Sequence, residues 1–139
     1  MLLNPKPMLD ITEIFNLKNN KEKADHLKAI SDEFYELSNK YRDSPKEIEV
    51  IVSANYMVLA TQYKYLSFAY NALANFPDFN FAGMNLKMIY DAIATYHKNL
   101  AIQYTDLFSE TKDKMYADFK TMNEKYSKAA ESMFKNVTK

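Results

Sequence analysis

His26 and His97 are the two histidines in this chain and the most obvious residues with a capacity for chemistry. Helical proteins often bind two metal ions through a Glu-x-x-His motif on each of two helices, together with two further glutamates. Lys23 and Ala94 stand three positions before the histidines, so the motif is absent. Glu22 can share a helix face with His26, but two ligands do not make a metal site. We therefore expect no metal site, with His26 solvated and His97 on the flank of a helix.

Nucleophilic catalysis and phosphate binding also lack their usual signals. No serine lies in a nucleophile-elbow motif, and no cysteine is present to supply a thiolate. Gly83 is the only glycine, which excludes a glycine-rich phosphate loop. Adjacent carboxylates such as Asp32 and Glu33 fit the charged face of a helix. We expect no catalytic residue, no cofactor and no enzymatic activity.

The charge balance and the first residues narrow the function classes further. Eighteen basic and eighteen acidic residues are interspersed, and no basic block stands out. Because nucleic-acid binding depends on clustered positive charge, we expect no nucleic-acid partner. Residues 1–10 contain two prolines and no apolar core of signal-peptide length. The absence of cysteine suits a reducing compartment, so we expect a cytoplasmic location.

The composition indicates an all-α fold. The chain has 139 residues, of which 47% are apolar, and this length suits one domain with a real core. Tight hairpins need residues with positive φ, and a single glycine provides few such places. We expect one domain over residues 1–139, a coiled-coil-like bundle of about three to four long amphipathic helices packed antiparallel.

Two helices are predicted before residue 43. Asp10 begins the sequence Asp-Ile-Thr-Glu, an N-cap followed by Glu13, which predicts a short helix within the segment 1–19. An Asn-Asn pair ends it. Over residues 21–42, apolar side chains recur at intervals of three or four, as on one stripe of an amphipathic helix. These side chains are Ala24, Leu27, Ile30, Phe34, Leu37 and Tyr41.

The next helix is predicted over residues 45–75. Ser44 is a good N-cap, Pro45 suits the first helical position, and Glu47 completes a capping box. From Val50 to Pro77 the only charged side chain is Lys64. One stripe consists of Ile48, Val52, Tyr56, Leu59, Tyr63, Leu66, Tyr70 and Leu73, and the opposite side carries Val50, Met57, Ala60, Phe68 and Ala72. A helix that is apolar on two sides must be covered on more than one side.

This apolar helix is not expected to span a membrane. Polar side chains are spread along its length, and each is costly in hydrocarbon. They are Asn55, Gln62, Lys64 and Asn71. We therefore expect no transmembrane segment.

The helical pattern resumes after Gly83 and extends over residues 84–136. It weakens over residues 109–114, so either one helix continues throughout or a turn divides it into two. No glycine or proline follows Gly83, and Leu107, Thr111 and Met115 keep the four-residue spacing across the weak stretch. This spacing favours the continuous helix, which would form a long coiled-coil-like arm. The alternative is a turn over residues 109–114 between two helices, which gives a four-helix bundle.

Aromatic residues and methionines are the most informative feature of the composition. The chain has eleven tyrosines, nine phenylalanines and eight methionines. A buried tyrosine hydroxyl needs a hydrogen-bond partner, whereas an interface keeps the ring dry and the hydroxyl wet. Some of these residues form the core, and others are expected to contact a hydrophobic surface or another copy of the chain. The expected contact residues are Met57, Tyr65, Phe68, Ala72, Phe76, Phe79 and Phe81.

The last three of these residues, Phe76, Phe79 and Phe81, form an aromatic cluster in the only clear loop. Two interpretations of the cluster remain open. The rings can fold back and close the end of the bundle, or they can insert into a hydrophobic phase or a partner's groove.

Two segments resemble the phasins, small helical proteins that coat polyhydroxyalkanoate granules. Ile48 to Asn55 reads Ile-Glu-Val-Ile-Val-Ser-Ala-Asn, which is similar to the run that opens a long helix in that family. The tail from Ala117 to Lys139 is similar to the family's carboxy-terminal helix in its spacing of small, apolar and charged positions. The two segments cover about a quarter of the chain. The chain departs from the family in having tyrosine, phenylalanine and methionine where phasins are rich in alanine and glutamine.

The phasin resemblance implies a protein without an active site that self-associates and coats a granule surface. The leading hypothesis is therefore a non-catalytic amphipathic protein on a hydrophobic polymer or granule surface, and homo-oligomers are expected. The alternative is a self-assembling structural subunit, such as a virion or filament coat protein, or a helical protein–protein interaction module.

Overall fold

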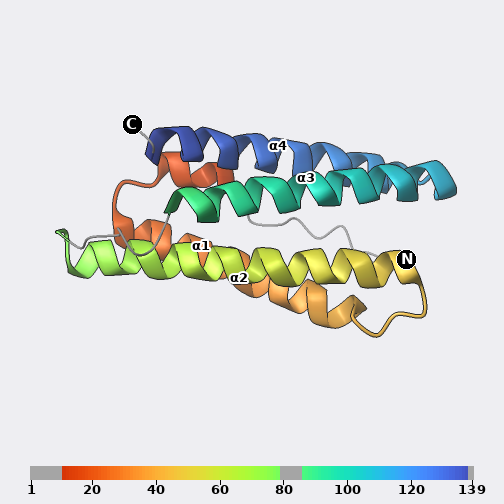
Figure 1. The fold of residues 1–139 in the computed structure, drawn as a ribbon, viewed down its shortest axis with the longest axis horizontal. Coiled ribbons are helices and arrows are strands. Elements are labelled where there is room, and N and C mark those ends of the chain that lie inside the picture. Colours follow the sequence, from red (N-terminus) through yellow and green to blue (C-terminus); the bar gives the residue numbers. More distant parts are fainter. Residues whose placement is uncertain (1–10, 79–85, 138–139) are drawn as a thin grey trace.

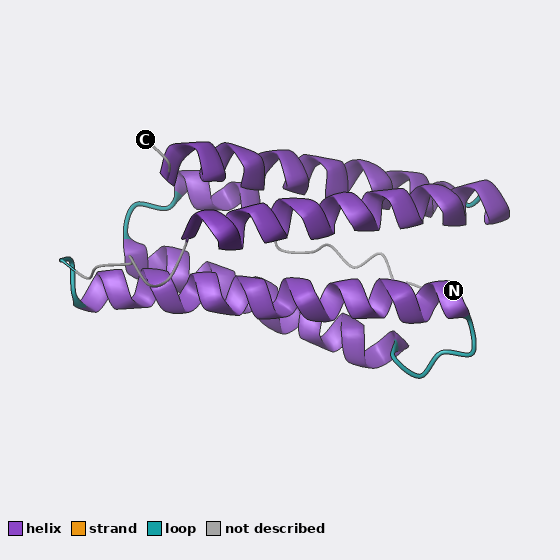
Figure 2. Ribbon diagram, viewed as in Figure 1, coloured by secondary structure: helices purple, strands orange, loops and turns teal. Residues whose placement is uncertain are grey.

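The computed structural model describes residues 11–78 and 86–137 of the chain. This part is helical and connected by short loops, without a strand (Figure 2). The elements are the 3₁₀ helix η1 (Ile11–Asn16) and the α-helices α1 (Asn20–Tyr41), α2 (Glu47–Asn75), α3 (Leu86–Thr111) and α4 (Lys114–Val137). The expected all-α bundle of long helices is confirmed.

The bundle consists of two antiparallel hairpins, α1–α2 and α3–α4, which lie against each other (Figure 1). The contact between the hairpins is mainly between α2 and α3. On the other side, η1 packs against both α1 and α4. Its two inward side chains, Ile11 and Ile14, are each 1% exposed, so η1 contributes to the core as well as linking the hairpins.

Small residues hold the α1–α2 hairpin together at close range. The Ser31 hydroxyl donates to the Ala60 carbonyl at 2.6 Å, and the Ser67 hydroxyl donates to the Ala24 carbonyl at 2.6 Å. Bonds from side chain to backbone between two helices require the helix axes to approach closely, which small residues allow. The facing pairs, Ser38 with Ser53, Ser31 with Ala60 and Ala24 with Ser67, recur every seven residues along both helices.

Among the described residues, the same kind of side-chain-to-backbone bond joins α3 to α4. The Ser127 hydroxyl donates to the Ala94 carbonyl at 2.7 Å, and both residues are buried. Farther along α3, Ala101 is 4% exposed. Charged side chains lie on the outward sides of α1, α3 and α4, as the amphipathic patterns predict, whereas the outward side of α2 is almost free of charge.

The amino-terminal elements agree with the sequence in part. α1 begins at Asn20, and the Asn19 side chain caps it by accepting a hydrogen bond from the Glu22 amide at 2.8 Å. The helix before it is a 3₁₀ helix, and its expected N-cap, Asp10, lies outside the described residues.

The expected capping of α2 by Ser44 is wrong. α2 begins at Glu47, and its N-cap residue, Lys46, makes no side-chain capping bond. Ser44 instead accepts a hydrogen bond from the Lys46 amide at 3.2 Å and donates to the buried Glu49 carboxylate at 2.5 Å. The serine thus satisfies a buried charge within the turn, and the helix starts two residues later than Pro45 predicts.

The expectation of one continuous helix over 84–136 is also wrong, and the two-helix alternative is correct. α3 ends at Thr111 and α4 begins at Lys114. Lys112 adopts a left-handed φ of 59°, and the Asp113 carboxylate caps α4 by accepting the Met115 amide at 3.0 Å. A lysine therefore takes the left-handed position that glycine usually fills after a helix.

No helix within the described ranges has a stretch both long and apolar enough to cross a bilayer.

Candidate functional site

The helix α2 has an inward side and an outward side with different chemistry. The stripe that the sequence places on one side, from Val52 to Tyr70, is buried in full, and Ile48 and Leu73 at its ends are half-buried. This inward side meets α3. Its tyrosines carry hydroxyl groups into the core, so their hydrogen-bond partners decide whether the packing is stable.

Three hydrogen-bonded pairs, which we name the tyrosine ladder, connect α2 with α3. The hydroxyl oxygens of Tyr70 and Tyr90 are 2.6 Å apart, and the hydroxyl oxygen of Tyr63 is 2.8 Å from Nε2 of His97. The pairs are Tyr56–Tyr104, Tyr63–His97 and Tyr70–Tyr90, so they recur every seven residues on both antiparallel helices. A seven-residue interval returns to the same helix face, which keeps the three pairs in one row.

The ladder shows where many of the tyrosines lie, in the core or at the surface. Eight of the eleven tyrosines are buried. A buried hydroxyl does need a partner, and in α2 and α3 that partner is another side chain of the same row. Much of the tyrosine enrichment therefore belongs to the core, where the sequence left core and interface positions undivided.

His97 is fully buried, so its expected place on the flank of a helix is wrong. Nδ1 of His97 lies 2.8 Å from Oδ1 of Asn123, and the Asn123 amide donates to the Phe119 carbonyl at 2.9 Å. A carbonyl only accepts, so the asparagine must turn its oxygen toward the ring. In the neutral imidazole the proton is therefore on Nδ1, and Nε2 accepts from Tyr63. The histidine joins α2, α3 and α4 through one side chain.

Aromatic rings surround the central pair of the ladder. Phe34 from α1 stacks on Tyr63 with ring centroids 5.6 Å apart, and it lies 5.7 Å from the His97 ring. Tyr126 from α4 meets the His97 ring edge-on at 5.3 Å. All four α-helices thus place a ring at this level of the core, which fixes the relative rotation of the helices.

Burial raises the pKa of four of the ladder tyrosines. Desolvation is the largest cause for Tyr56, Tyr70, Tyr90 and Tyr104, because the phenolate form would lose its hydration inside the bundle. These hydroxyls stay protonated and act as hydrogen-bond donors and acceptors. Their arrangement suits packing and helix register.

The outward side of α2 holds most of the expected contact residues. Tyr65 is 52% exposed, Phe68 is 61% exposed and Phe76 is 66% exposed. Met57 and Ala72 lie on the same side and are half-buried. Phe79 and Phe81 lie outside the described residues. The structure therefore brings five of the expected contact residues together along one face.

We name this face the outer stripe and define it by its spacing. Its members follow one another at intervals of three or four, which keeps them within one narrow sector of the helix. They are Val50, Ala54, Met57, Thr61, Tyr65, Phe68, Ala72 and Phe76. Phe76 directly follows α2 and stays joined to it, because its amide donates to the Ala72 carbonyl at 2.8 Å.

A groove of about 420 Å³ borders the outer stripe on the α1 side. Phe68 and Lys64 contribute from α2, and Tyr35 contributes from α1 and is 42% exposed. The remaining charged residues of the groove alternate in sign along α1: Lys21, Asp25, Lys28 and Asp32. The outer stripe therefore has one charged border and an uncharged centre.

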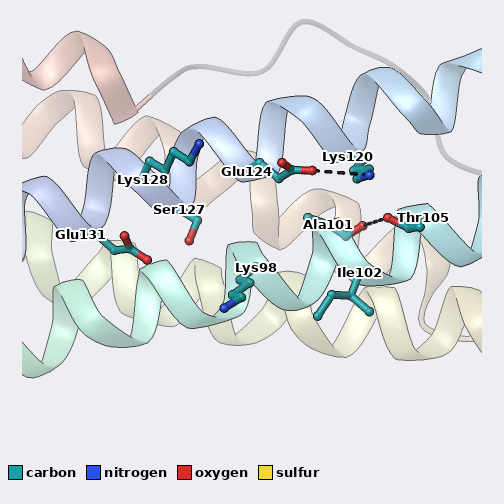
Figure 3. Close-up of a pocket in the computed structure, with 9 residues that line it drawn as sticks. All are labelled: Lys98, Ala101, Ile102, Thr105, Lys120, Glu124, Ser127, Lys128 and Glu131. Atoms are coloured by element: carbon teal, nitrogen blue, oxygen red, sulfur yellow. Dashed lines mark hydrogen bonds and ion pairs between the residues drawn. The ribbon is translucent and has the colours of Figure 1, made fainter.

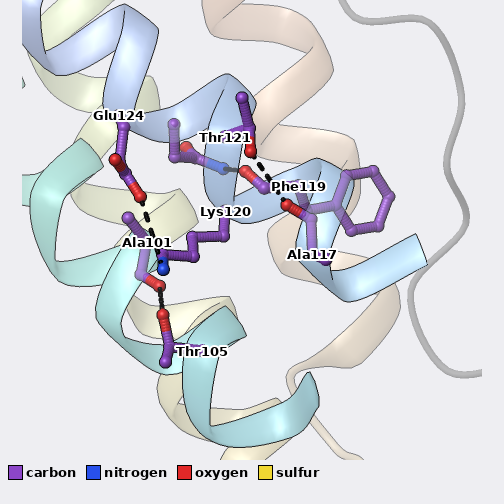
Figure 4. A network of polar contacts seen from close by, with 8 residues as sticks. Ala101, Thr105, Ala117, Phe119, Lys120, Thr121 and Glu124 are labelled. Carbon is purple, nitrogen blue, oxygen red and sulfur yellow. Dashed lines mark hydrogen bonds and ion pairs between the residues drawn. The ribbon is translucent and has the colours of Figure 1, made fainter. Parts of the chain in front are cut away.

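A second groove, of about 320 Å³, lies between α3 and α4 (Figure 3). Figure 4 shows the polar contacts at one end of it, where Lys120 lies 3.8 Å from Glu124 and the Thr105 hydroxyl donates to the Ala101 carbonyl at 2.8 Å. Ile102 is 55% exposed beside these charges. Charges of both signs line this groove, so it differs from the uncharged outer stripe.

His26 is less solvated than the sequence suggests. Its side chain is 11% exposed, and its Nδ1 lies 3.9 Å from the Glu13 carboxylate. The expectation of a solvated histidine is wrong because η1 packs against α1. Throughout residues 11–78 and 86–137, no group of three or more histidines and carboxylates is placed to hold a metal ion.

Comparisons with protein-family models, with curated proteins and with solved structures find no match to this chain.

Proposed function

We propose that this protein coats or organises a hydrophobic surface without catalysing a reaction, and that it adsorbs through the outer stripe of α2. The observation that carries the proposal is the exposure of Tyr65, Phe68 and Phe76, which are 52%, 61% and 66% exposed. They lie between Val50 and Pro77, a stretch in which the only charged side chain is that of Lys64.

Exposed aromatic residues in one row carry a free-energy cost in water. Burying one large apolar side chain contributes about 1.5–3 kcal/mol. Contiguous exposed apolar surface in a folded protein commonly marks an interaction site. Three aromatic rings along one helix can thus drive adsorption when a hydrophobic phase is available.

The fold supports adsorption in the folded state. The tyrosine ladder lies on the opposite side of α2, so contact with a surface does not require the core to open. Tyr63 and Tyr65 illustrate the division: Tyr63 is 1% exposed and bonded to His97, whereas Tyr65 is 52% exposed. The bundle serves as a rigid backing that keeps the outer stripe outward.

The resemblance to phasins supports a polyhydroxyalkanoate granule as the surface and the cytoplasm as the location. The segment that carries the resemblance, Ile48 to Asn55, forms the start of α2 and includes the first two residues of the outer stripe. A granule surface offers the extended apolar contact that a row of exposed rings requires. No catalytic residue or cofactor enters this function.

Adsorption to hydrophobic nanoparticles tests the proposal. Phe68→Lys combined with Phe76→Lys removes two exposed rings, and we expect the affinity for polyhydroxybutyrate or polystyrene particles to fall on the order of a hundredfold. The matched control is Ile102→Lys with Met88→Lys, which places the same charges at residues of α3 that are 55% and 67% exposed. The proposal fails if the folded stripe variant adsorbs like the unmodified protein, or if the α3 control loses as much.

A further inference from the structure

The middle pair of the tyrosine ladder differs from the other two in the base that the tyrosine meets. The hydroxyl of Tyr63 donates to Nε2 of His97 at 2.8 Å, whereas in the two outer pairs each hydroxyl meets another hydroxyl. An imidazole nitrogen takes up a proton near neutral pH, and a phenolic oxygen does not. In the middle pair, therefore, the tyrosine can pass its proton to a base along an existing hydrogen bond.

A hydrogen-bonded base makes a buried phenol open to one-electron oxidation. A phenol that loses an electron and keeps its proton becomes a radical cation, which is costly in a core that cannot hydrate the charge. Burial also disfavours the phenolate, because desolvation raises the pKa of Tyr70 and Tyr90 on the next level of the ladder. The electron and the proton must therefore leave the ring together, and this step needs a proton acceptor at the hydroxyl.

Asn123 fixes the other side of the imidazole. Its Oδ1 lies 2.8 Å from Nδ1 of His97, and its amide donates to the Phe119 carbonyl at 2.9 Å, so the oxygen stays turned toward the ring. The Nδ1 proton is held there, which leaves Nε2 as the acceptor for Tyr63. After proton transfer both nitrogens carry a proton, and both hydrogen bonds persist with Nε2 as the donor. No side chain has to rotate.

The aromatic rings around the pair suit the products of such a transfer. The ring centroids of Phe34 and Tyr126 lie 5.7 and 5.3 Å from that of His97. A ring attracts a cation within about 6 Å, which partly compensates the burial of an imidazolium. Tyr63 is 1% exposed, so its ring carbons cannot meet a tyrosyl radical of another chain and couple to dityrosine.

Access of an oxidant does not require the bundle to open. Tyr63 lies on the inward side of α2, so the helix itself separates it from solvent. A helix with its side chains is about 10 Å across. Electrons tunnel through protein over such a distance, while the proton stays inside the bundle with His97.

We propose that Tyr63 and His97 form a one-electron redox site, at which an organic peroxyl radical in solution converts Tyr63 to a neutral tyrosyl radical. The electron passes from the phenol to the oxidant, the O–H bond of Tyr63 breaks, and an N–H bond forms at Nε2 of His97. The peroxyl radical is reduced to the hydroperoxide anion, which takes a proton from water. A reductant of the ascorbate class returns one electron, and the proton goes back to the tyrosine oxygen.

The site accepts one oxidising equivalent per chain, so it scavenges radicals stoichiometrically. This activity goes beyond the proposed coating function, because it uses the inward side of α2 and is independent of adsorption through the outer stripe.

Oxidation by photogenerated tris(bipyridine)ruthenium(III), followed by electron paramagnetic resonance on frozen samples, tests the site in the wild-type protein. With ¹⁵N-labelled histidine, we expect the long-lived tyrosyl radical to show hyperfine coupling to a histidine nitrogen. His26→Gln, which removes the other histidine, should keep the coupling. This measurement does not depend on whether a variant at the site folds. A surviving radical without coupling to histidine nitrogen overturns the proposal.

Two tyrosine variants separate the base from the packing of the ladder. In Tyr63→Phe we expect the coupled radical to disappear and the yield of long-lived radical to fall at least roughly tenfold, since transfer to a positioned base is lost. Tyr70→Phe is the matched control, because it removes a ladder hydroxyl that meets another hydroxyl, and it should retain the coupled radical. An unchanged yield in Tyr63→Phe, or an equal loss in Tyr70→Phe, contradicts the proposal.

A water-soluble azo initiator supplies the peroxyl radicals themselves. We expect the same histidine-coupled signal with this oxidant, and ascorbate should remove the signal and return protein of unchanged mass. A signal with ruthenium but none with peroxyl radicals would contradict the peroxyl radical as the oxidant. Dityrosine cross-links between chains in place of the coupled radical would show that the oxidising equivalent stays on exposed rings such as Tyr65, and would overturn the redox site.

Discussion

The hydroxyl oxygen of Tyr63 lies 2.8 Å from Nε2 of His97, and this pair is the middle one of the three hydrogen-bonded pairs between α2 and α3. His97 continues the connection to α4 through Asn123. This pair fixes which side of α2 faces inward. Because Tyr63 points into the bundle, Tyr65 two residues later points out of it, so the ladder and the outer stripe are two consequences of one helix rotation.

Removing the Tyr63 hydroxyl should destabilise the fold. Tyr63→Phe removes the donor to Nε2 of His97 inside the core, and we expect a loss of about 1–3 kcal/mol in the free energy of unfolding. Urea unfolding followed by circular dichroism measures the change. Tyr65→Phe is the matched control, because the same atom is removed from a ring that is 52% exposed, and its effect should stay within about 0.5 kcal/mol. Equal losses in the two variants would show that the ladder contributes nothing specific.

The ladder also predicts loss of stability at alkaline pH. Burial raises the pKa of Tyr56, Tyr70, Tyr90 and Tyr104 above the ordinary 10.0, so the folded state retains protons that the unfolded state releases. The stabilisation is complete below pH 10 and declines as the pH rises above it, by about 1.4 kcal/mol per pH unit for each such tyrosine.

Urea titrations at a series of pH values, with tyrosinate absorbance recorded in parallel, test this alkaline effect. We expect the buried tyrosines to ionise together with unfolding. If they titrate near pH 10 in a chain that remains helical, the ladder is accessible to solvent and the prediction is wrong.

Replacing Lys112, in the link between α3 and α4, with glycine should stabilise the fold. Lys112 has a φ of 59°, a conformation that glycine adopts without a steric penalty. Lys112→Gly should therefore raise the free energy of unfolding by about 0.5–1 kcal/mol. Lys114→Gly, at the first residue of α4, is the control and should lower it. A destabilised Lys112→Gly variant would favour the continuous helix that the four-residue spacing predicts.

Removing the Ser44 hydroxyl from the turn before α2 should lower the stability of the fold. Glu49 is 3% exposed, and Ser44 donates a hydrogen bond to its carboxylate. Ser44→Ala should cost about 1.5–3 kcal/mol, because a buried charged group loses a donor. Thermal unfolding of Ser44→Ala beside Ser132→Ala, a substitution at an exposed position of α4, isolates this effect. Identical melting temperatures would show that the Ser44 hydroxyl does not stabilise the turn.

The helices could be predicted because their signals are local. The four- and three-residue spacing of Val52, Tyr56 and Leu59 marks the inward side of α2 in the sequence, and the structure confirms it. The break at Lys112 was missed because no glycine marks it. The Asp113 cap is a local signal that could have located the break.

The ladder could not be predicted, since its contacts are between distant segments. Tyr56, Tyr63 and Tyr70 show a seven-residue interval in the sequence, but their partners lie 20 to 48 residues away. Pairing them requires the antiparallel register of α2 and α3. The burial of His97 depends in addition on Asn123 from α4. Sequence spacing placed His97 near the apolar stripe but could not supply these partners.

A tryptophan reporter tests adsorption through the outer stripe, because the chain contains no tryptophan of its own. Phe68→Trp places the indole on the stripe, and Ile102→Trp places it on α3 at a residue of similar exposure. On addition of polyhydroxybutyrate nanoparticles, we predict that the Phe68→Trp emission shifts to the blue and becomes protected from a soluble quencher, while Ile102→Trp stays unchanged. A shift at Ile102→Trp alone, or no shift at Phe68→Trp in a protein that has bound, would contradict adsorption through the outer stripe.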